Sequence, residues 1–168
     1  PLKTGRLIKL LKENTKVPID FHTHCTPGYG LASTLTAILN GVDIVDTSIG
    51  SFAGGPAAPA FEIIQIFCDK LNIDTGVDKK AVAEIAKELR IIRKELAEHD
   101  SYKQFPIEFD ISNYTLPKEI DKLFDLAIQE AKEEKEENLL ETTQEIEKYF
   151  NYPEPDESIK KAEIPGGM

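Results

Sequence analysis

The chain has 168 residues, 40% of them hydrophobic and 30% charged, so it is long enough to form a domain with a hydrophobic core and too polar to be embedded in a membrane. No apolar run approaches the ~20 residues that a membrane-spanning helix needs. The formal net charge of −10 disfavours nucleic acids and anionic membrane surfaces as partners.

The first 48 residues predict alternating helices and strands. Residues 5–15 have the apolar spacing of a short amphipathic helix, and residues 17–24 alternate apolar and polar side chains as a strand does. Residues 31–40 predict a second helix with Ser33 and Thr34 on its polar side, and residues 42–48 predict a second short strand. Helix, strand, helix and strand in this order indicate parallel βαβ winding.

Two of the three histidines, His22 and His24, lie at the end of the first predicted strand. Residues i and i+2 of a strand point to the same face, so these imidazoles leave the backbone roughly 6–7 Å apart and can converge on one metal ion. The Thr-Pro-Gly-Tyr-Gly sequence that follows ends the strand at the edge where α/β sheets place their chemistry. A hydrogen-bonded or surface pair without metal is the alternative.

The two cysteines, Cys25 and Cys68, are far apart and form no Cys-x-x-Cys motif, which favours a reducing, cytoplasmic location. Cys68 stands in an apolar run and is expected to be a buried side chain. Cys25 follows His24 directly and is a further candidate metal ligand as a thiolate. On a strand, however, it would face away from both imidazoles.

The second predicted strand is followed by a loop of glycine, alanine and proline at residues 49–60. It should lie on the same rim as the histidines, where its small residues would let backbone N–H groups approach a substrate carboxylate. A structural turn without a ligand is the alternative.

The rest of the sequence predicts mainly helices. Residues 61–71 form a largely buried helix, and Asp78 caps a long helix that continues to about Glu98. Residues 101–117 are irregular, and residues 118–150 form a charged helix with a break near Asn138. The segment 118–161 contains fourteen acidic residues and seven lysines, as expected for a solvated helix surface.

Two predicted strands cannot form a closed sheet, and a (β/α)8 barrel usually takes ~250 residues. The pattern therefore suggests a piece of something larger.

Three motifs resemble one known family. They are Ile19-Asp20-Phe21-His22-Thr23-His24-Cys25-Thr26-Pro27-Gly28, then Asn40-Gly41-Val42-Asp43-Ile44-Val45-Asp46-Thr47, and finally Glu163-Ile164-Pro165-Gly166-Gly167-Met168. In this order they are similar to the carboxyltransferase domain of biotin-dependent enzymes. That group includes pyruvate carboxylase (its B subunit or its central domain), the oxaloacetate decarboxylase α subunit and the transcarboxylase 5S subunit.

The resemblance implies an α/β fold: the C-terminal part of a TIM-type (β/α)8 barrel, with its last two strands, followed by a mainly helical extension. Residues 1–76 would belong to the barrel. Residues 77–168 would form the extension, with an acidic helical insertion at about 105–155 and the start of the post-barrel region. In the family the His-x-His pair binds a divalent metal (Zn, Mn, Co or Mg), so His22 and His24 are the implied ligands. The other two ligands, an aspartate and a carboxylated lysine, would lie outside this chain.

The implied activity is transfer of a carboxyl group between carboxybiotin and pyruvate or oxaloacetate, with biotin on a separate carrier domain. Biotin carboxylase or membrane decarboxylase subunits are the implied partners, and the full-length form is expected to be a homo-oligomer. Relatives have a proton-shuttling threonine after the eighth strand, where this chain has Pro56, so no catalytic residue is assigned there. The isolated chain is expected to be inactive. The sequence leaves open the choice between carboxylation, decarboxylation and transcarboxylation.

Two other functions stay open. One is a metal-dependent acyl-CoA lyase or condensing enzyme of the HMG-CoA lyase and isopropylmalate synthase type, which shares the barrel and the His-x-His pair. The lyases have a catalytic cysteine in their glycine-rich loop, and residues 54–57 contain none. The other is a non-enzymatic helical interaction module formed by residues 78–150.

Overall fold

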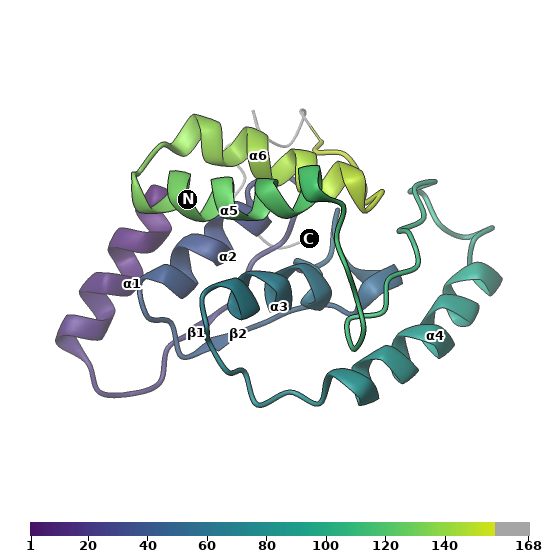
Figure 1. The fold of residues 1–168 in the computed structure, drawn as a ribbon, viewed down its shortest axis with the longest axis horizontal. Coiled ribbons are helices and arrows are strands. Elements are labelled where there is room, and N and C mark those ends of the chain that lie inside the picture. The colour runs from purple at the N-terminus through teal and green to yellow at the C-terminus, as the bar shows by residue number, and fades with distance from the viewer. Residues whose placement is uncertain (157–168) are drawn as a thin grey trace.

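The computed structural model describes residues 1–156, and most of them are helical (Figure 1). The element order confirms the predicted succession of helix, strand, helix and strand at the start of the chain. The elements are α1 (Leu2–Asn14), β1 (Asp20–Phe21), α2 (Gly30–Leu39), β2 (Ile44–Val45), the 3-10 helix η1 (Gly50–Phe52), α3 (Phe61–Lys70), α4 (Lys79–Glu95), α5 (Lys118–Lys132) and α6 (Glu136–Tyr149).

The sheet consists of β1 and β2, which pair in parallel with Asp20 opposite Ile44 and Phe21 opposite Val45. Both strands are shorter than predicted. Before β1, the N–H of Ile19 donates to the side chain of Asp43, at 2.8 Å. After β1, the N–H of Cys25 donates to Ala57 in the following loop. The parallel βαβ unit is thus present, while the described residues do not show the remaining strands of a barrel.

Helix α2 is buried on nearly every side. It contacts α1 as well as α3, α5 and α6 (Figure 1). The sequence-based assignment of Ser33 and Thr34 to a polar face is therefore wrong: both are buried, at 6% and 0% exposure. A helix that is covered by other helices on all sides buries its polar residues together with its apolar ones.

The α5–α6 hairpin lies over α2 and covers the hydrophobic core (Figure 1). Phe124 of α5 packs on Phe67 of α3, with ring centroids 4.8 Å apart. The helix break predicted near Asn138 falls earlier, at residues 133–135, where Glu134 adopts a positive φ of 56°. Asn138 itself lies inside α6, so the position of the break was predicted wrongly.

Helix α4 lies at one end of the molecule (Figure 1). The side chain of Asp78 accepts hydrogen bonds from the backbone N–H groups of Lys80 and Ala81, which confirms the predicted cap. The helix packs on η1 through one face only, so part of its apolar stripe, including Ile85 and Ile92, is exposed to solvent.

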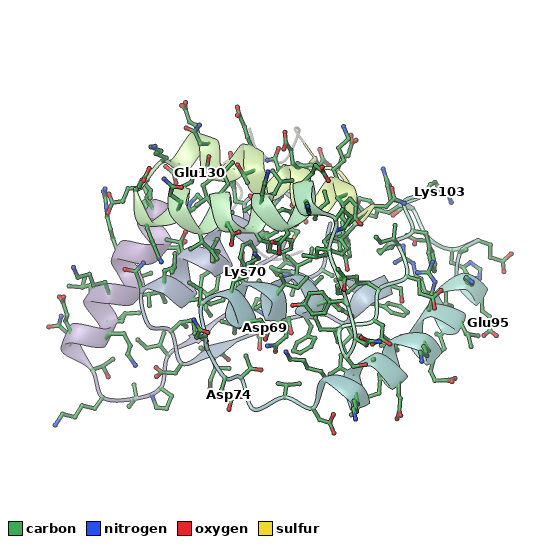
Figure 2. All side chains as sticks on the ribbon, in the orientation of Figure 1. Asp69, Lys70, Asp74, Glu95, Lys103 and Glu130 are labelled. Atoms are coloured by element: carbon green, nitrogen blue, oxygen red, sulfur yellow. The ribbon has the colours of Figure 1, made fainter. Side chains whose placement is uncertain are left out.

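A polar network around Asp69 fastens the irregular segments to α3. Asp69 accepts hydrogen bonds from Lys79 Nζ at 2.7 Å, from Gln65 Nε2 at 2.8 Å and from the Tyr114 hydroxyl at 3.1 Å. It stands at the end of α3, beside Lys70 and ahead of the loop that contains Asp74 (Figure 2). Partial burial opposes ionisation, but these donors lower the pKa of Asp69 below its usual value.

Replacing Asp69 by asparagine is expected to lower the free energy of unfolding by about 2 kcal/mol, because the charge-assisted bonds to Lys79 and Tyr114 lose their ionised acceptor. Since the folded-state pKa is lowered, the contribution is full above the usual aspartate pKa of about 4 and is lost as the pH falls below it. Urea unfolding at pH 7 and at pH 3 measures both effects. The control Asp125→Asn removes only an exposed pair with Lys70 and should change stability by less than about 1 kcal/mol.

Two expectations from the sequence are not tested by the structure. The Glu163-Ile164-Pro165-Gly166-Gly167-Met168 motif lies outside the described residues. The proposed division between residues 1–76 and 77–168 stays a prediction.

Among residues 1–156, no helix combines the length and the apolar character that crossing a bilayer requires.

Candidate metal centre

The structure brings the two histidines of the His-x-His motif into contact. Their Nε2 atoms are 3.0 Å apart, and the ring centroids are 4.9 Å apart at an angle of 75°. Both residues lie in the segment just after β1, beyond the end of the strand itself, and their side chains meet on one side of the chain, as predicted.

The other ring nitrogen of each histidine is held by an oxygen. His22 Nδ1 lies 2.8 Å from a carboxylate oxygen of Asp46, and His24 Nδ1 lies 2.5 Å from the carbonyl oxygen of Pro56. Carboxylate and carbonyl oxygens accept hydrogen bonds and cannot donate them, so both Nδ1 atoms are assigned as N–H donors. In the neutral rings, both Nε2 atoms then present lone pairs.

Two lone pairs that face each other at 3.0 Å repel, and either a proton on one nitrogen, which gives an N–H···N hydrogen bond, or a metal ion between the two nitrogens removes the repulsion. Two Zn–N bonds of 2.0–2.1 Å at a tetrahedral angle require a nitrogen separation of about 3.3 Å, so an opening of roughly 0.3 Å would admit the ion. Neutral imidazole nitrogen is also a common ligand type for zinc and other transition metals. The donor set of His22 and His24 therefore fits a divalent metal.

Asp46 is a residue of this site that the sequence-based assignment missed. It follows Val45 of β2, and Val45 pairs with Phe21, so the parallel register puts Asp46 beside His22. Its backbone N–H also donates to the Phe21 carbonyl at 3.1 Å. A metal-binding histidine commonly donates its second ring N–H to a carboxylate, and this fixes both tautomer and orientation. The available signal was an aspartate within the second predicted strand, residues 42–48.

The metal centre is open in this chain. The side chains of His22 and Asp46 are 58% and 49% exposed. Among residues 1–156, no three or more histidine, cysteine, aspartate or glutamate side chains form a group that could hold a metal ion. The two histidines are thus the donors that the described residues bring together, and their ligation of a metal stays a prediction.

Cys25 is buried beside Glu147 of α6, which makes it a poor candidate for a metal ligand. It is 5% exposed, and burial followed by the nearby Glu147 carboxylate raises the pKa of its thiol well above the usual value. A buried, protonated thiol is a poor metal ligand. Cys68 is buried as predicted, at 4% exposure.

Glu147 of α6 forms a hydrogen bond with the Cys25 thiol, and desolvation raises the pKa of this carboxyl to about 7. A folded-state pKa raised from 4.5 means that stability is full below pH 4.5 and falls as the pH rises towards 7. We expect the free energy of unfolding to drop by about 2–3 kcal/mol across this range. Glu147→Gln should remove the dependence, whereas the exposed neighbour Glu145→Gln should retain it. Urea titrations at pH 5 and pH 8 measure the difference.

The glycine-rich loop lies on the same rim as the histidines, because the Pro56 carbonyl contacts His24. Five of the ten backbone N–H groups in residues 49–60 already donate hydrogen bonds within the protein, so these five are not available to a substrate carboxylate; use of the other five as a carboxylate cradle stays a prediction. Four of the engaged groups donate to carbonyls inside the loop, and the N–H of Gly50 donates to Glu62 at 3.0 Å; the four are those of Phe52, Ala53, Gly54 and Ala57. These bonds hold part of the loop from within, and its observed contact with the histidines is that of the Pro56 carbonyl with His24.

The first half of the chain matches a known protein family. Residues 1–89 match the HMGL-like family model, and the chain belongs to this family. The match covers both strands and both histidines of the metal centre.

The curated relatives include both carboxylase subunits and aldolases. The chain is 33% identical over 111 residues to the 2-oxoglutarate carboxylase large subunit of Hydrogenobacter thermophilus, a match that covers 65% of this chain. It is 40% identical over 85 residues to the pyruvate carboxylase B subunit of Methanocaldococcus jannaschii, covering 51% of this chain. A 4-hydroxy-2-oxovalerate aldolase of Brevibacillus brevis is 29% identical over 89 residues, covering 53% of this chain. The matched parts amount to only 16%, 15% and 26% of these proteins.

A solved structure agrees on the fold. The carboxyltransferase domain of Rhizobium etli pyruvate carboxylase aligns with 89% of this chain and 24% of that chain, with a TM-score of 0.54 and 24% sequence identity. The recognised family is thus confirmed, and the fold resembles a carboxyltransferase domain, with this chain matching a part of each relative.

Proposed function

We propose that this chain forms part of a biotin-dependent carboxyltransferase that moves a carboxyl group between carboxybiotin and pyruvate or oxaloacetate. The observation that supports it most is the His22–His24 arrangement, in which both Nδ1 atoms are held by acceptors and both Nε2 atoms face one point. The relatives named as carboxylase subunits point to the same class of reaction.

In this proposal, the Nε2 atoms of His22 and His24 hold a divalent metal (Zn, Mn, Co or Mg), together with ligands from outside this chain. When bound, the metal supplies Lewis-acid polarisation of a keto-acid carbonyl, and biotin on a separate carrier domain supplies the carboxyl group. Asp46 keeps the proton of His22 on Nδ1, and the Pro56 carbonyl does the same for His24. Each ring therefore offers its Nε2 lone pair to the metal.

The proposed partners are a biotinyl carrier domain and a biotin carboxylase or membrane decarboxylase subunit, in a homo-oligomeric full-length protein located in the cytoplasm. Residues 1–76 would supply the last two strands of the barrel, and residues 77–168 would supply the helical extension. At the position of the family's threonine, Pro56 has no side-chain proton to transfer, so another group would perform that step.

The test is a carboxyl-exchange assay on the full-length protein with oxaloacetate as donor and biotin as acceptor. We expect exchange that requires a bound metal and is lost in the His24→Ala variant. Metal-loaded protein that exchanges no carboxyl group would overturn the proposal.

Aldol cleavage is the second candidate, because the match to 4-hydroxy-2-oxovalerate aldolase includes part of the same half of the chain. Incubation of the full-length protein with 4-hydroxy-2-oxovalerate separates the two functions. Release of pyruvate from this compound, without carboxyl exchange, would favour the aldolase.

A further inference from the structure

The segment that follows α6 crosses both loops that flank the metal centre. Residues 152–156, which we name the C-terminal strap, pass first over the loop after β2 and then over the loop after β1. The strap and α6 belong to the helical insertion implied by the sequence, far from the histidines along the chain. Their contacts link the insertion to the site.

The first half of the strap lies against the loop that ends at Pro56. A Cβ added at Gly54 would lie 2.8 Å from the Tyr152 ring, and one added at Gly55 would lie 3.0 Å from Pro153. The Tyr152 hydroxyl also donates to the Gly50 carbonyl at 3.3 Å. The loop therefore contains glycine where the strap passes, because a larger residue there would displace either the loop or the strap.

The second half of the strap and α6 hold the loop that follows His24. A Cβ at Gly28 would lie 2.6 Å from Pro155, and the Asp156 N–H donates to the Thr26 carbonyl at 2.9 Å. Gln144 of α6 donates to the Gly28 carbonyl at 3.4 Å. The strap and α6 thus hold the backbone that follows His24.

The two loops are also hydrogen-bonded to each other on either side of Pro56. The Thr26 hydroxyl donates to the Gly55 carbonyl at 3.2 Å, and the Cys25 N–H donates to the Ala57 carbonyl at 3.0 Å. The Pro56 carbonyl, which accepts from His24 Nδ1, lies between these two ties. Its position relative to the imidazole thus depends on residues that the strap contacts.

We propose that the C-terminal strap is a positioning element of the metal centre: it holds the Pro56 carbonyl against His24 Nδ1 and so keeps the His24 Nε2 lone pair directed at His22. The consequence for metal affinity rests on the proposed function, whereas the consequence for the His24 tautomer does not. The acidic helical insertion then has a role at the site, which it exerts through its contacts with the two loops.

The test compares Tyr152→Ala with Tyr149→Ala in the ¹⁵N-labelled full chain. Tyr149 is a matched control, because it is an aromatic residue of α6 whose ring packs on Phe150. In metal-free protein, ¹⁵N NMR of the imidazoles reports which nitrogen of His24 is protonated. We expect protonated Nδ1 in the wild type and in Tyr149→Ala, and a shift of the proton towards Nε2 in Tyr152→Ala. Zn²⁺ titration should then show a dissociation constant about 10-fold higher for Tyr152→Ala.

Tyr152→Phe provides a second variant that retains the buried ring and loses only the bond to Gly50, so it will serve if Tyr152→Ala fails to fold. It should shift the tautomer in the same direction by a smaller amount. A folded Tyr152→Ala or Tyr152→Phe protein with the wild-type His24 tautomer would overturn the inference, even if Zn²⁺ binds normally. A wild-type chain that binds no Zn²⁺, with the tautomer shift still present in the variants, would contradict the proposed metal site and support the positioning role of the strap.

Discussion

Replacing either histidine of the pair by alanine is expected to remove Zn²⁺ binding from this chain, with a dissociation constant raised at least about 100-fold. The two Nε2 atoms, 3.0 Å apart, are the donors that the described residues offer. One imidazole alone loses the chelate arrangement, and losing a ligand costs more than the 10–100-fold typical of a supporting contact. Isothermal titration with Zn²⁺, and absorption spectra with Co²⁺, measure the loss.

The matched control for this prediction is His99→Ala, which removes the third histidine of the chain. Its side chain is 73% exposed beyond the end of α4 and pairs with Glu98. It should leave the affinity within about 2-fold of the wild type. Equal weakening by all three substitutions would show that Zn²⁺ binds the acidic surface without a defined site.

The second large effect is expected from Asp46. Asp46→Ala should raise the dissociation constant for Zn²⁺ about 10- to 100-fold, because His22 loses the acceptor that holds its proton on Nδ1. The free ring can then place its proton on Nε2 and withdraw the lone pair from the metal. Thermal unfolding of the metal-free variant should change little, since the Asp46–His22 pair is exposed.

Asp20→Ala is the control for charge. This exposed carboxylate at the start of β1 lies two residues before His22, and removing it changes the net charge by the same amount. A 10-fold weaker affinity in both variants would assign the effect to long-range attraction of the cation. A weaker affinity only in Asp46→Ala would assign it to the orientation of His22.

How far the sequence predicts this site depends on which contacts are local. The period-2 alternation before His22 places His22 and His24 on one face, and the structure brings them together. Asp46 and Pro56 are 24 and 32 residues away, and their contacts depend on the register of two strands and on the path of a loop. Neither is visible in local periodicity.

The same distinction applies to the fold. The capping residue Asp78 was predicted correctly, because the cap contacts residues only two and three positions away. The burial of Ser33 and Thr34 was not predicted, because burial depends on which neighbouring helices cover each face. The break after α5 was predicted near Asn138, whereas the chain breaks the helix at Glu134, which adopts a left-handed conformation.

The strap shows why the glycines of the loop after β2 were interpreted differently from the sequence. Small residues suggested backbone N–H groups that approach a substrate. In the structure, Gly54 and Gly55 give room to Tyr152 and Pro153, which are about 100 residues further along the chain. Such a close approach between distant segments leaves no local pattern in the sequence.

The central claim is that the Nε2 atoms of His22 and His24 bind one divalent metal ion. The most direct test is a Zn²⁺ titration of the ¹⁵N-labelled chain in which NMR follows the imidazole nitrogens of all three histidines. We predict that the Nε2 signals of His22 and His24 shift together and saturate at one equivalent, while both Nδ1 atoms stay protonated and His99 is unchanged. Zn²⁺ that shifts His99 alone, or that leaves the His22 and His24 nitrogens unperturbed at saturation, would contradict the claim.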